Sequence, residues 1–313
     1  MRKSSIVLKE KRSKIHDNRL AEFRQDNSIY IITCGLTGCP CNGKDEGCGR
    51  GFFSLFLQAI YGIDFSLRNG MPYHIDFGNI GYRYTNEKLP DLNFWNYYFE
   101  QPITKLPEYT TPVFNRFIEL YPLRIWNRNH FRQINNRVIK DLKLKSDLQF
   151  FIGNRTKKFR RKKILGIHIR GTDHSDEVPP VKFEKYVETI NRLLPSYDNL
   201  FVATDDMKLL QRLDKLYRTK IMFNEVARSN DEIPIHLNSS IKDREKLGYD
   251  VILDCYCLSL CKKAILIHSN VSYSALMLNP ELSYTLLERP KSKTERLKTL
   301  LLYHLNKWNI RKW

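Results

Sequence analysis

The sequence predicts an α/β protein made of two halves, each a parallel β-sheet covered by helices. Short apolar segments that suit strands alternate with longer segments of helical periodicity, which is the pattern of parallel α/β folds. A length of 313 residues is sufficient for two domains of ordinary size. The strongly basic segment 157–163 interrupts the alternation near the middle. We therefore expect one α/β domain in residues 1–155 and a second in residues 156–290.

The first half is the less regular of the two. Residues 28–33 (SIYIIT) suit a strand, and a loop rich in glycine and cysteine leads to a helix at 52–67. A second strand is expected at 73–77. Residues 94–99 (FWNYYF) form a dense aromatic patch, and residues 110–132 are expected to be irregular with some helix.

The second half predicts a doubly wound unit, in which parallel strands alternate with helices on both faces of one sheet. The expected strands are 164–169, 200–204, 221–223, 264–268 and 284–287. The expected helices are 180–194, 206–217, 249–261 and 271–278. Because such sheets bind ligands beyond the carboxyl ends of their strands, polar residues at those ends are candidate site residues.

Both ends of the chain are basic. Residues 291–313 predict a basic helix with its leucines on one side, which favours packing against the body of the protein over contact with a membrane. The first residues, MRKSS, are followed by no apolar stretch, and no apolar run in the chain approaches the roughly 20 residues of a membrane-spanning helix. We expect a cytoplasmic protein, with peripheral contact to the inner face of a membrane as a further option.

The net charge calls for an anionic partner or surface. There are 52 Lys and Arg residues against 34 Asp and Glu residues, which gives +18. Nucleic acid is one candidate, but no helix-turn-helix, RNP-type aromatic motif or zinc finger accompanies the charge. A solvated basic surface is the other explanation.

The cysteines predict buried thiols rather than a metal site. There are seven of them, an odd number, which favours reduced thiols in a reducing compartment. Cys34, Cys39, Cys41 and Cys48 crowd one loop, yet their spacing contains no C-x₂-C pair typical of zinc ligands.

The first candidate cluster follows the strand 164–169. His168 and Arg170 point the same way if the strand is regular, and both lie at its carboxyl end. An arginine can grip a diphosphate with two hydrogen bonds and stabilise its charge as a bond breaks. Asp173 could orient this arginine, and a structural ion pair between the two is the alternative.

Two further clusters follow the next strands. Asp205 and Asp206 are adjacent acids after the strand 200–204, where a helix cap is the simpler explanation and no metal is expected. Polar residues also follow the strand 264–268, at the start of a helix whose N–H groups suit a phosphate. These polar residues are Ser269, Asn270 and Ser272.

Two isolated features complete the candidate site. Asp254 is one acid in an otherwise apolar helix, and its burial requires a partner; a guanine edge with two N–H donors would satisfy it. In the first half, Gly49 and Gly51 precede Phe52 at the start of the helix 52–67, where glycine allows close approach of the backbone to a ligand.

Together these segments resemble the GDP-fucose-dependent fucosyltransferase superfamily, which has the GT-B fold, and in particular its nodulation-type and core α1,6 members. GIHIRGTDH is similar to the family's H-x-R-R-T-D-K element, and FVATDD to the strand before its acidic pair. VILDCYCLSLCKKAILIHSNVSYSAL is similar to its third motif, and GCGRG to its Gly-rich loop. The resemblance covers most of residues 164–288 and short stretches of the first half.

The resemblance implies a GT-B enzyme with two Rossmann-like domains and a donor cleft between them, residues 1–155 on the acceptor side. It implies that Arg170 contacts the β-phosphate and that His168 and Asp254 lie at the guanine. It places the polar residues 269, 270 and 272 near the pyrophosphate, with the loop 49–52 closing over it. The family inverts the anomeric centre and needs no metal or other cofactor.

The catalytic base and the departures from the motif come from the same comparison. Glu177 matches the family's catalytic glutamate if one gap is accepted, and it would take the proton of the acceptor hydroxyl. The second arginine of the motif is Gly171 here, and the lysine is His174. Arg228 and His236, in the loop before the Asp254 helix, are candidates for replacement contacts, as is Arg244; solvated loop residues are the alternative.

The sequence therefore predicts transfer of L-fucose from GDP-fucose to a glycan hydroxyl, with inversion, in the synthesis of a surface polysaccharide or glycolipid. The expected partners are a nucleotide sugar and a glycan or lipid-linked glycan acceptor, and not nucleic acid. Use of another nucleotide sugar is one alternative. A basic nucleic-acid-binding protein without catalysis is the other.

Overall fold

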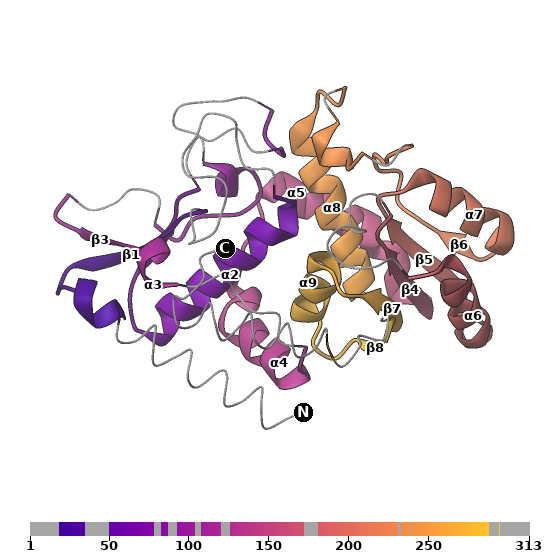
Figure 1. The fold of residues 1–313 in the computed structure, drawn as a ribbon, viewed down its shortest axis with the longest axis horizontal. Coiled ribbons are helices and arrows are strands. Elements are labelled where there is room, and N and C mark those ends of the chain that lie inside the picture. The colour runs from indigo at the N-terminus through magenta and orange to yellow at the C-terminus, as the bar shows by residue number, and fades with distance from the viewer. Residues whose placement is uncertain are drawn as a thin grey trace.

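The protein folds into two parallel β-sheets with helices between and around them, as the computed structural model shows (Figure 1). The structure describes residues 19–34, 50–77, 83–86, 93–103, 108–119, 126–171, 181–230, 233–238, 240–287 and 294. The predicted helix at 291–313 lies outside this range except for Thr294. Among the described residues, no helix combines the length and apolar character needed to cross a bilayer.

The N-terminal sheet has the strand order β2-β1-β3, and both pairings are parallel. β1 (Ser28–Ile32) is fully buried in the middle, β2 (Tyr73–Ile75) lies on one side and β3 (Thr111–Phe114) on the other. β3 falls within the stretch expected to be irregular, and it is followed at once by the single turn α3 (Asn115–Ile118). Pro112 is tolerated in β3 because this strand has a neighbour on one side only among the described strands.

The C-terminal sheet has the order β6-β5-β4-β7-β8, and every neighbouring pair is parallel. Its strands are β4 (Ile164–Ile169), β5 (Asn199–Thr204), β6 (Ile221–Met222), β7 (Lys263–Ile267) and β8 (Ser283–Leu287). The chain runs outward from β4 to β6 on one side and then crosses over to continue with β7 on the other. The predicted doubly wound topology is confirmed, with its switch point between β4 and β7.

Helices cover both faces of this sheet. α6 (Phe183–Leu193) and α7 (Met207–Tyr217) pack on the face to which Leu165, Ile167 and Ile169 point. α8 (Arg244–Ser259) and α9 (Asn270–Leu278) cover the other face, toward the N-terminal half (Figure 1). α8 begins five residues earlier than the predicted 249 because Asp243 caps it, accepting a hydrogen bond from the N–H of Lys246 at 3.1 Å.

Three helices join the two halves: α2 (Phe52–Arg68), α4 (Arg128–Arg137) and α5 (Ser146–Thr156). The Tyr61 hydroxyl of α2 lies 2.7 Å from the Tyr273 hydroxyl of α9 and 3.0 Å from His130 Nε2 of α4. The buried Asp64 accepts hydrogen bonds from Arg68 and Arg137, which ties α2 to α4. One apolar cluster runs continuously from the N-terminal sheet to α8 and α9.

The aromatic patch at 94–99 forms the 3₁₀ turn η1 (Phe94–Tyr97) and packs against α8. Tyr98 is fully buried, and its ring meets that of Phe52 edge to face at 4.8 Å. Gly248 of α8 faces the Tyr98 phenol so closely that a Cβ atom there would overlap it. The contact between η1 and α8 therefore depends on the absence of a side chain at position 248.

We predict that Gly248→Ala lowers the free energy of unfolding by about 1–3 kcal/mol, because the new methyl group displaces the Tyr98 ring. Gly153→Ala, in α5, is the matched control: a Cβ there has open space, so alanine should raise stability by about 0.5–1 kcal/mol. Urea denaturation measures both. The two variants should shift stability in opposite directions, and a stabilised Gly248→Ala protein would show that α8 does not pack closely on Tyr98.

Candidate active site

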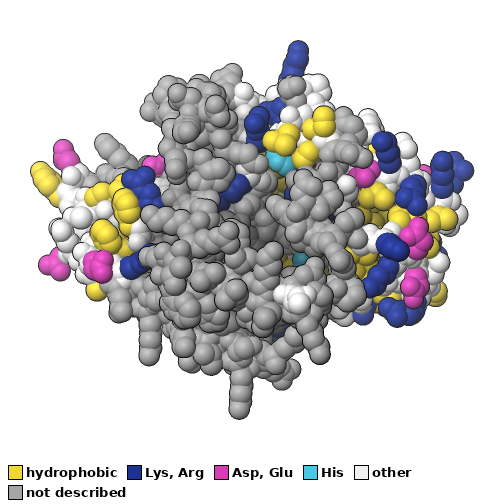
Figure 2. Space-filling view, viewed as in Figure 1, with side chains coloured by type: hydrophobic (Ala, Val, Ile, Leu, Met, Phe, Trp, Pro, Cys, Tyr) yellow, Lys and Arg dark blue, Asp and Glu magenta, His cyan; other side chains and the backbone are white. Residues whose placement is uncertain are grey.

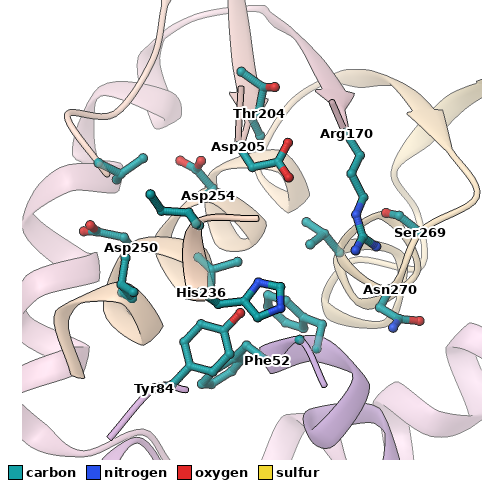
Figure 3. A pocket seen from close by; sticks show the side chains of 18 of the residues that line it. Phe52, Tyr84, Arg170, Thr204, Asp205, His236, Asp250, Asp254, Ser269 and Asn270 are labelled. Carbon is teal, nitrogen blue, oxygen red and sulfur yellow. The ribbon is translucent and has the colours of Figure 1, made fainter. Parts of the chain in front are cut away.

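A cavity of about 590 Å³ opens between the two halves at the carboxyl ends of β4 and β5 (Figure 3). Its walls come from the start of α2, the ends of β4 and β5, the loop that precedes α8, α8 itself and the start of α9. This volume is in the range of small-molecule sites, and the position is the switch point where doubly wound sheets bind ligands.

Two helices begin at this cavity. α2 starts after Gly51, which offers no side-chain cap, and α9 starts after Ser269, whose Oγ accepts a hydrogen bond from the N–H of Ser272 at 3.1 Å. The first turn of a helix has N–H groups without intrahelical acceptors, and the helix dipole adds positive potential. A Cβ at Gly51 would meet only open space, which leaves room for a ligand close to the backbone. Both helix starts favour an anion.

Two guanidinium groups line the same cavity from opposite halves. Arg170 extends from the end of β4 toward Ser269 and Asn270 at the start of α9 (Figure 3). Arg50 comes from the N-terminal half, where it donates hydrogen bonds to Gln58 Oε1 at 2.6 Å and to the Cys34 carbonyl at 3.0 Å. The arrangement places positive charge on both sides of the space between the two helix starts.

His168 connects the end of β4 to the start of α9. Its Nδ1 atom lies 2.8 Å from Ser272 Oγ and 3.1 Å from Ser269 Oγ, and the side chain is buried. These contacts hold the first turn of α9 beside the strand that carries Arg170. His168 lines the cavity, whereas Ser272 lies behind the lining.

The adjacent acids Asp205 and Asp206 hold the turn between β5 and α7. Asp205 Oδ1 accepts a hydrogen bond from the N–H of Gly171 at 3.0 Å, and Asp206 Oδ1 accepts one from the N–H of Leu209 at 3.0 Å. The expected helix cap is thus Asp206, and Asp205 alone of the two lines the cavity. In the described part of the chain, no three His, Cys, Asp or Glu side chains are grouped as metal ligands would be.

Gly171 has no room for the arginine of the family motif. A Cβ atom at this position would overlap the Asp206 side chain. The close packing between the end of β4 and the start of α7 therefore requires glycine at position 171, where the motif has arginine. A second cation in the cavity has to come from elsewhere, and Arg50 is one that the structure places there.

Asp254 lies at the opposite side of the cavity from Arg170 (Figure 3). Its Oδ1 accepts a hydrogen bond from Asn224 Nδ2 at 2.7 Å. Burial raises the pKa of this carboxyl to about 7, although the Asn224 hydrogen bond and the positive charge of Arg228 act in the other direction. Arg228 itself is buried, and its guanidinium donates to the Asn224 carbonyl at 2.8 Å. It supports the Asp254 wall without lining the cavity.

Among the lining residues that the sequence patterns did not single out, those with ionisable side chains are Arg50, Tyr84 and Asp250. Asp250 is buried and ion-paired with Lys246 at 2.9 Å. It precedes Asp254 by one helical turn, so both carboxylates share a face of α8. The Tyr84 ring stacks on His236, with ring centroids 5.9 Å apart, and the two form one wall.

Comparison with known proteins identifies the architecture. No protein-family model matches the sequence, and a comparison with curated proteins gives no match. The crystal structure of NodZ α-1,6-fucosyltransferase soaked with GDP-fucose superposes with a TM-score of 0.55 at 14% identity, covering 86% of this chain and 97% of NodZ. NodZ from Bradyrhizobium gives a TM-score of 0.53 at 13% identity, covering 82% and 95% of the two chains. The chain has the NodZ fold. The expected GT-B architecture is confirmed, at an identity too low to carry function with it.

The predicted site residues fall into three groups. The structure brings nine of them to one cavity: Gly51, Phe52, His168, Arg170, Asp205, His236, Asp254, Ser269 and Asn270. Ser272, Asp206 and Arg228 support the lining from behind, and Arg244 donates to the carbonyls of His236 and Asn238 in the loop that precedes α8. Gly49, Asp173, His174 and Glu177 lie outside the described residues, and their roles stay predictions.

The described cysteines are buried thiols, at positions 34, 255, 257 and 261. Burial raises the pKa of the Cys257 thiol to about 12, so it remains protonated at neutral pH. The remaining cysteines of the Gly-rich loop, Cys39, Cys41 and Cys48, lie outside the described residues, and the expectation about a zinc site stays open.

We predict that Asp254→Asn stabilises the unliganded protein more at pH 8 than at pH 5. The folded-state pKa of about 7 lies above the value of 3.8 expected for an exposed carboxyl. Between these values the unfolded chain releases a proton that the folded chain keeps, so wild-type stability falls as pH rises and is constant above 7. Between pH 5 and pH 8 the effect is at most about 3 kcal/mol, because each pH unit below 7 corresponds to about 1.36 kcal/mol.

Urea denaturation of both proteins at pH 5 and pH 8 checks this, since all other titrating groups cancel in the difference. If the difference between variant and wild type is the same at both pH values, Asp254 keeps its charge in the folded cavity and the assignment of its pKa is wrong.

Proposed function

We propose that this chain is a glycosyltransferase that transfers L-fucose from GDP-fucose to a glycan hydroxyl. The observation that carries the proposal is that Arg50, Arg170 and the starts of α2 and α9 all line one cavity, with the buried Asp254 on the side opposite Arg170. A nucleoside diphosphate has the matching distribution: two phosphates at one end and a hydrogen-bonding base at the other. The fold shared with NodZ, whose structures were obtained with GDP-fucose or GDP, supports this choice of donor.

The diphosphate would lie between Arg170 and the first turn of α9, near Ser269 and Asn270, with Arg50 reaching it from the N-terminal half. Arginine and the backbone N–H groups of a helix start are strong donors to phosphate oxygens. His168 would position the start of α9 through its contacts with the serines rather than bind the base. Gly51 and Phe52 would form the opposite wall, close to the phosphates.

Asp254 would select guanine. An ionised carboxylate accepts two hydrogen bonds from the adjacent N1–H and N2–H groups of guanine, whereas uracil presents one N–H flanked by carbonyl oxygens. Because burial holds the carboxyl near its midpoint at neutral pH, the guanine contact would shift it to the ionised form. Asn224 and Arg228 would hold the carboxylate in place, and His236 with Tyr84 would form the neighbouring wall.

The proposed reaction is a single displacement with inversion and without a metal ion. The acceptor oxygen attacks the anomeric carbon while the bond from that carbon to the β-phosphate oxygen breaks, and the electron pair leaves with GDP. Arg170 and Arg50 would stabilise the developing charge on the diphosphate. Glu177, carried over from the family motif, would take the proton of the acceptor hydroxyl. Asp173 and His174 would lie beside the donor in the same segment.

The acceptor side is proposed from the same comparison. A glycan or lipid-linked glycan would enter from the N-terminal half, which would make the enzyme part of surface polysaccharide or glycolipid synthesis. A cytoplasmic location, peripheral to the inner face of a membrane, would match such an acceptor and the net charge of +18.

We predict that GDP binds at least tenfold more tightly than UDP and that Asp254→Asn removes most of this preference. Arg170→Ala and Arg50→Ala should each weaken GDP binding by about 10–100-fold, the cost of losing a charge-assisted hydrogen bond. Isothermal titration calorimetry measures all of these. Arg155→Ala is the matched control, since this exposed arginine of α5 stacks on Phe151 away from the cavity.

Equal affinity for GDP and UDP would contradict the role of Asp254, and tight binding retained by Arg170→Ala would contradict the position of the diphosphate. Binding of nucleic acid that is insensitive to Arg170→Ala, in a protein without GDP affinity, would favour the non-enzymatic alternative.

We predict that Glu177→Gln lowers kcat for fucosyl transfer by at least about 100-fold, the range of general base catalysis, without changing the affinity for GDP-fucose. Glu184→Gln, an exposed glutamate in the first turn of α6, is the control and should leave both quantities unchanged. Near-normal turnover of the Glu177→Gln enzyme would show that another group accepts the proton.

A further inference from the structure

The amino ends of the C-terminal strands form a second charged surface, opposite the cavity. Because all five strands are parallel, their amino ends share one edge of the sheet, while the cavity lies at the other edge. Lysines lie at the starts of three of these strands. Lys162 and Lys163 directly precede β4, Lys220 directly precedes β6, and Lys262 and Lys263 lie at the start of β7. No residue of this edge lines the cavity.

Hydrogen bonds show that these segments lie side by side. The N–H of Lys163 donates to Asp198 Oδ2 at 2.7 Å, and Lys162 Nζ donates to Asn199 Oδ1 at 3.0 Å. The N–H of Lys262 donates to the Ile164 carbonyl at 2.9 Å. On the other side of β4, Lys220 Nζ lies 3.4 Å from the Tyr197 carbonyl, which precedes β5. The lysines therefore belong to one continuous surface.

The ends of neighbouring helices and turns extend this surface. α7 ends beside β6 with Lys215 and Arg218, and the 3₁₀ turn η3 (Lys157–Arg161) leads into β4. We call the whole the amino-edge surface. Its described basic residues are Lys157, Lys158, Arg161, Lys162, Lys163, Lys215, Arg218, Lys220, Lys262 and Lys263. The same segments contain two acids, Asp198 and Asp214, and a third, Glu281, precedes β8 and pairs with Arg132 of α4. Ten positive charges therefore face three negative ones at this edge.

Apolar side chains flank the lysines. Leu216, at the end of α7, is 55% exposed, and Leu260, just after α8, is 46% exposed. These helices cover opposite faces of the sheet, so the two leucines lie on either side of the lysine row. Over α6, α7 and β6, Lys and Arg side chains are interspersed with apolar and acidic ones (Figure 2).

The combination of cations and leucines identifies the partner. Cations near a helix C-terminus stabilise the helix dipole, which accounts for Lys215 but not for the lysines that open strands. Lysines alone would suit the phosphates of nucleic acid as well, but exposed leucines beside lysines suit the boundary between lipid headgroups and acyl chains, for which a phosphate backbone has no apolar counterpart. We propose that the amino-edge surface binds the anionic headgroups of a lipid bilayer, with Leu216 and Leu260 entering the interface.

This docking would hold the cavity away from the bilayer. β4 has six residues, and at about 3.3 Å per residue it separates the two edges by about 20 Å. The cavity would remain open to soluble donor. The inference stands apart from the proposed reaction, because it concerns a surface that contributes nothing to the cavity.

The test is co-sedimentation of the full chain with vesicles of phosphatidylcholine alone or mixed with phosphatidylglycerol. We expect binding to the mixed vesicles only. The edge variant replaces Lys157, Lys158, Lys162 and Lys163 by Gln, and the control variant replaces Lys182, Lys185, Lys208 and Lys242 by Gln. Both lose four exposed charges. Since each lysine near an anionic surface contributes about fivefold, the edge variant should lose at least about 100-fold in affinity and the control little.

A third protein, Leu216→Ser with Leu260→Ser, should also bind vesicles more weakly while its affinity for a double-stranded DNA oligonucleotide is unchanged. Equal losses in the two lysine variants would overturn the proposal in favour of net charge, and no loss in the edge variant would overturn it in favour of the basic chain ends. Vesicle binding unaffected by the leucine changes, with tighter binding to the oligonucleotide, would point to nucleic acid instead. GDP affinity and thermal unfolding confirm that each variant is folded and keep this test separate from the enzyme proposal.

Discussion

The contacts of His168 with Ser269 and Ser272 hold the end of β4 against the first turn of α9, and the geometry of the cavity follows from them. These elements meet where the strand order reverses, so the sheet leaves a crevice beyond its edge. The strand direction then brings Arg170 toward the start of the helix. The Tyr61 and Tyr273 hydroxyls tie α2 to α9 from the other half, which brings a second helix start to the same space.

The charged groups of the cavity differ in burial. Arg50, Arg170 and the starts of α2 and α9 line the open space, while Asp254 is buried in the wall opposite Arg170. A carboxyl with a pKa near 7 needs little free energy to be neutral at neutral pH, and it can ionise when a ligand supplies hydrogen-bond donors. The two walls therefore favour different parts of one ligand, and neither needs the other to be charged in the empty protein.

The sequence predicted the C-terminal sheet well because its strands are buried on both faces and appear as short apolar runs between helices. β3 was missed because Pro112 and a length of four residues leave no strand pattern. α5 was missed because exposed apolar residues such as Phe150 disrupt its periodicity. The site residues at strand ends followed from the topology, whereas the contacts behind the lining could not be predicted: His168 contacts two serines, and Arg228 supports the Asp254 wall. Arg50 was not predicted as a site residue because the Gly-rich loop was interpreted through its glycines. The positive charge of Arg50 beside them was the feature that indicated an anion site.

The close packing of Gly171 against Asp206 links two positions that are 35 apart in the chain. Asp206 caps α7, and a side chain at 171 has no space while that cap is in place. Gly171 cannot be replaced by arginine while Asp206 caps α7. The cap residue at position 206 must change first, so that the end of β4 has space for a larger side chain. Related sequences should therefore show these two sites changing in concert, so that glycine at the first accompanies a bulkier cap at the second.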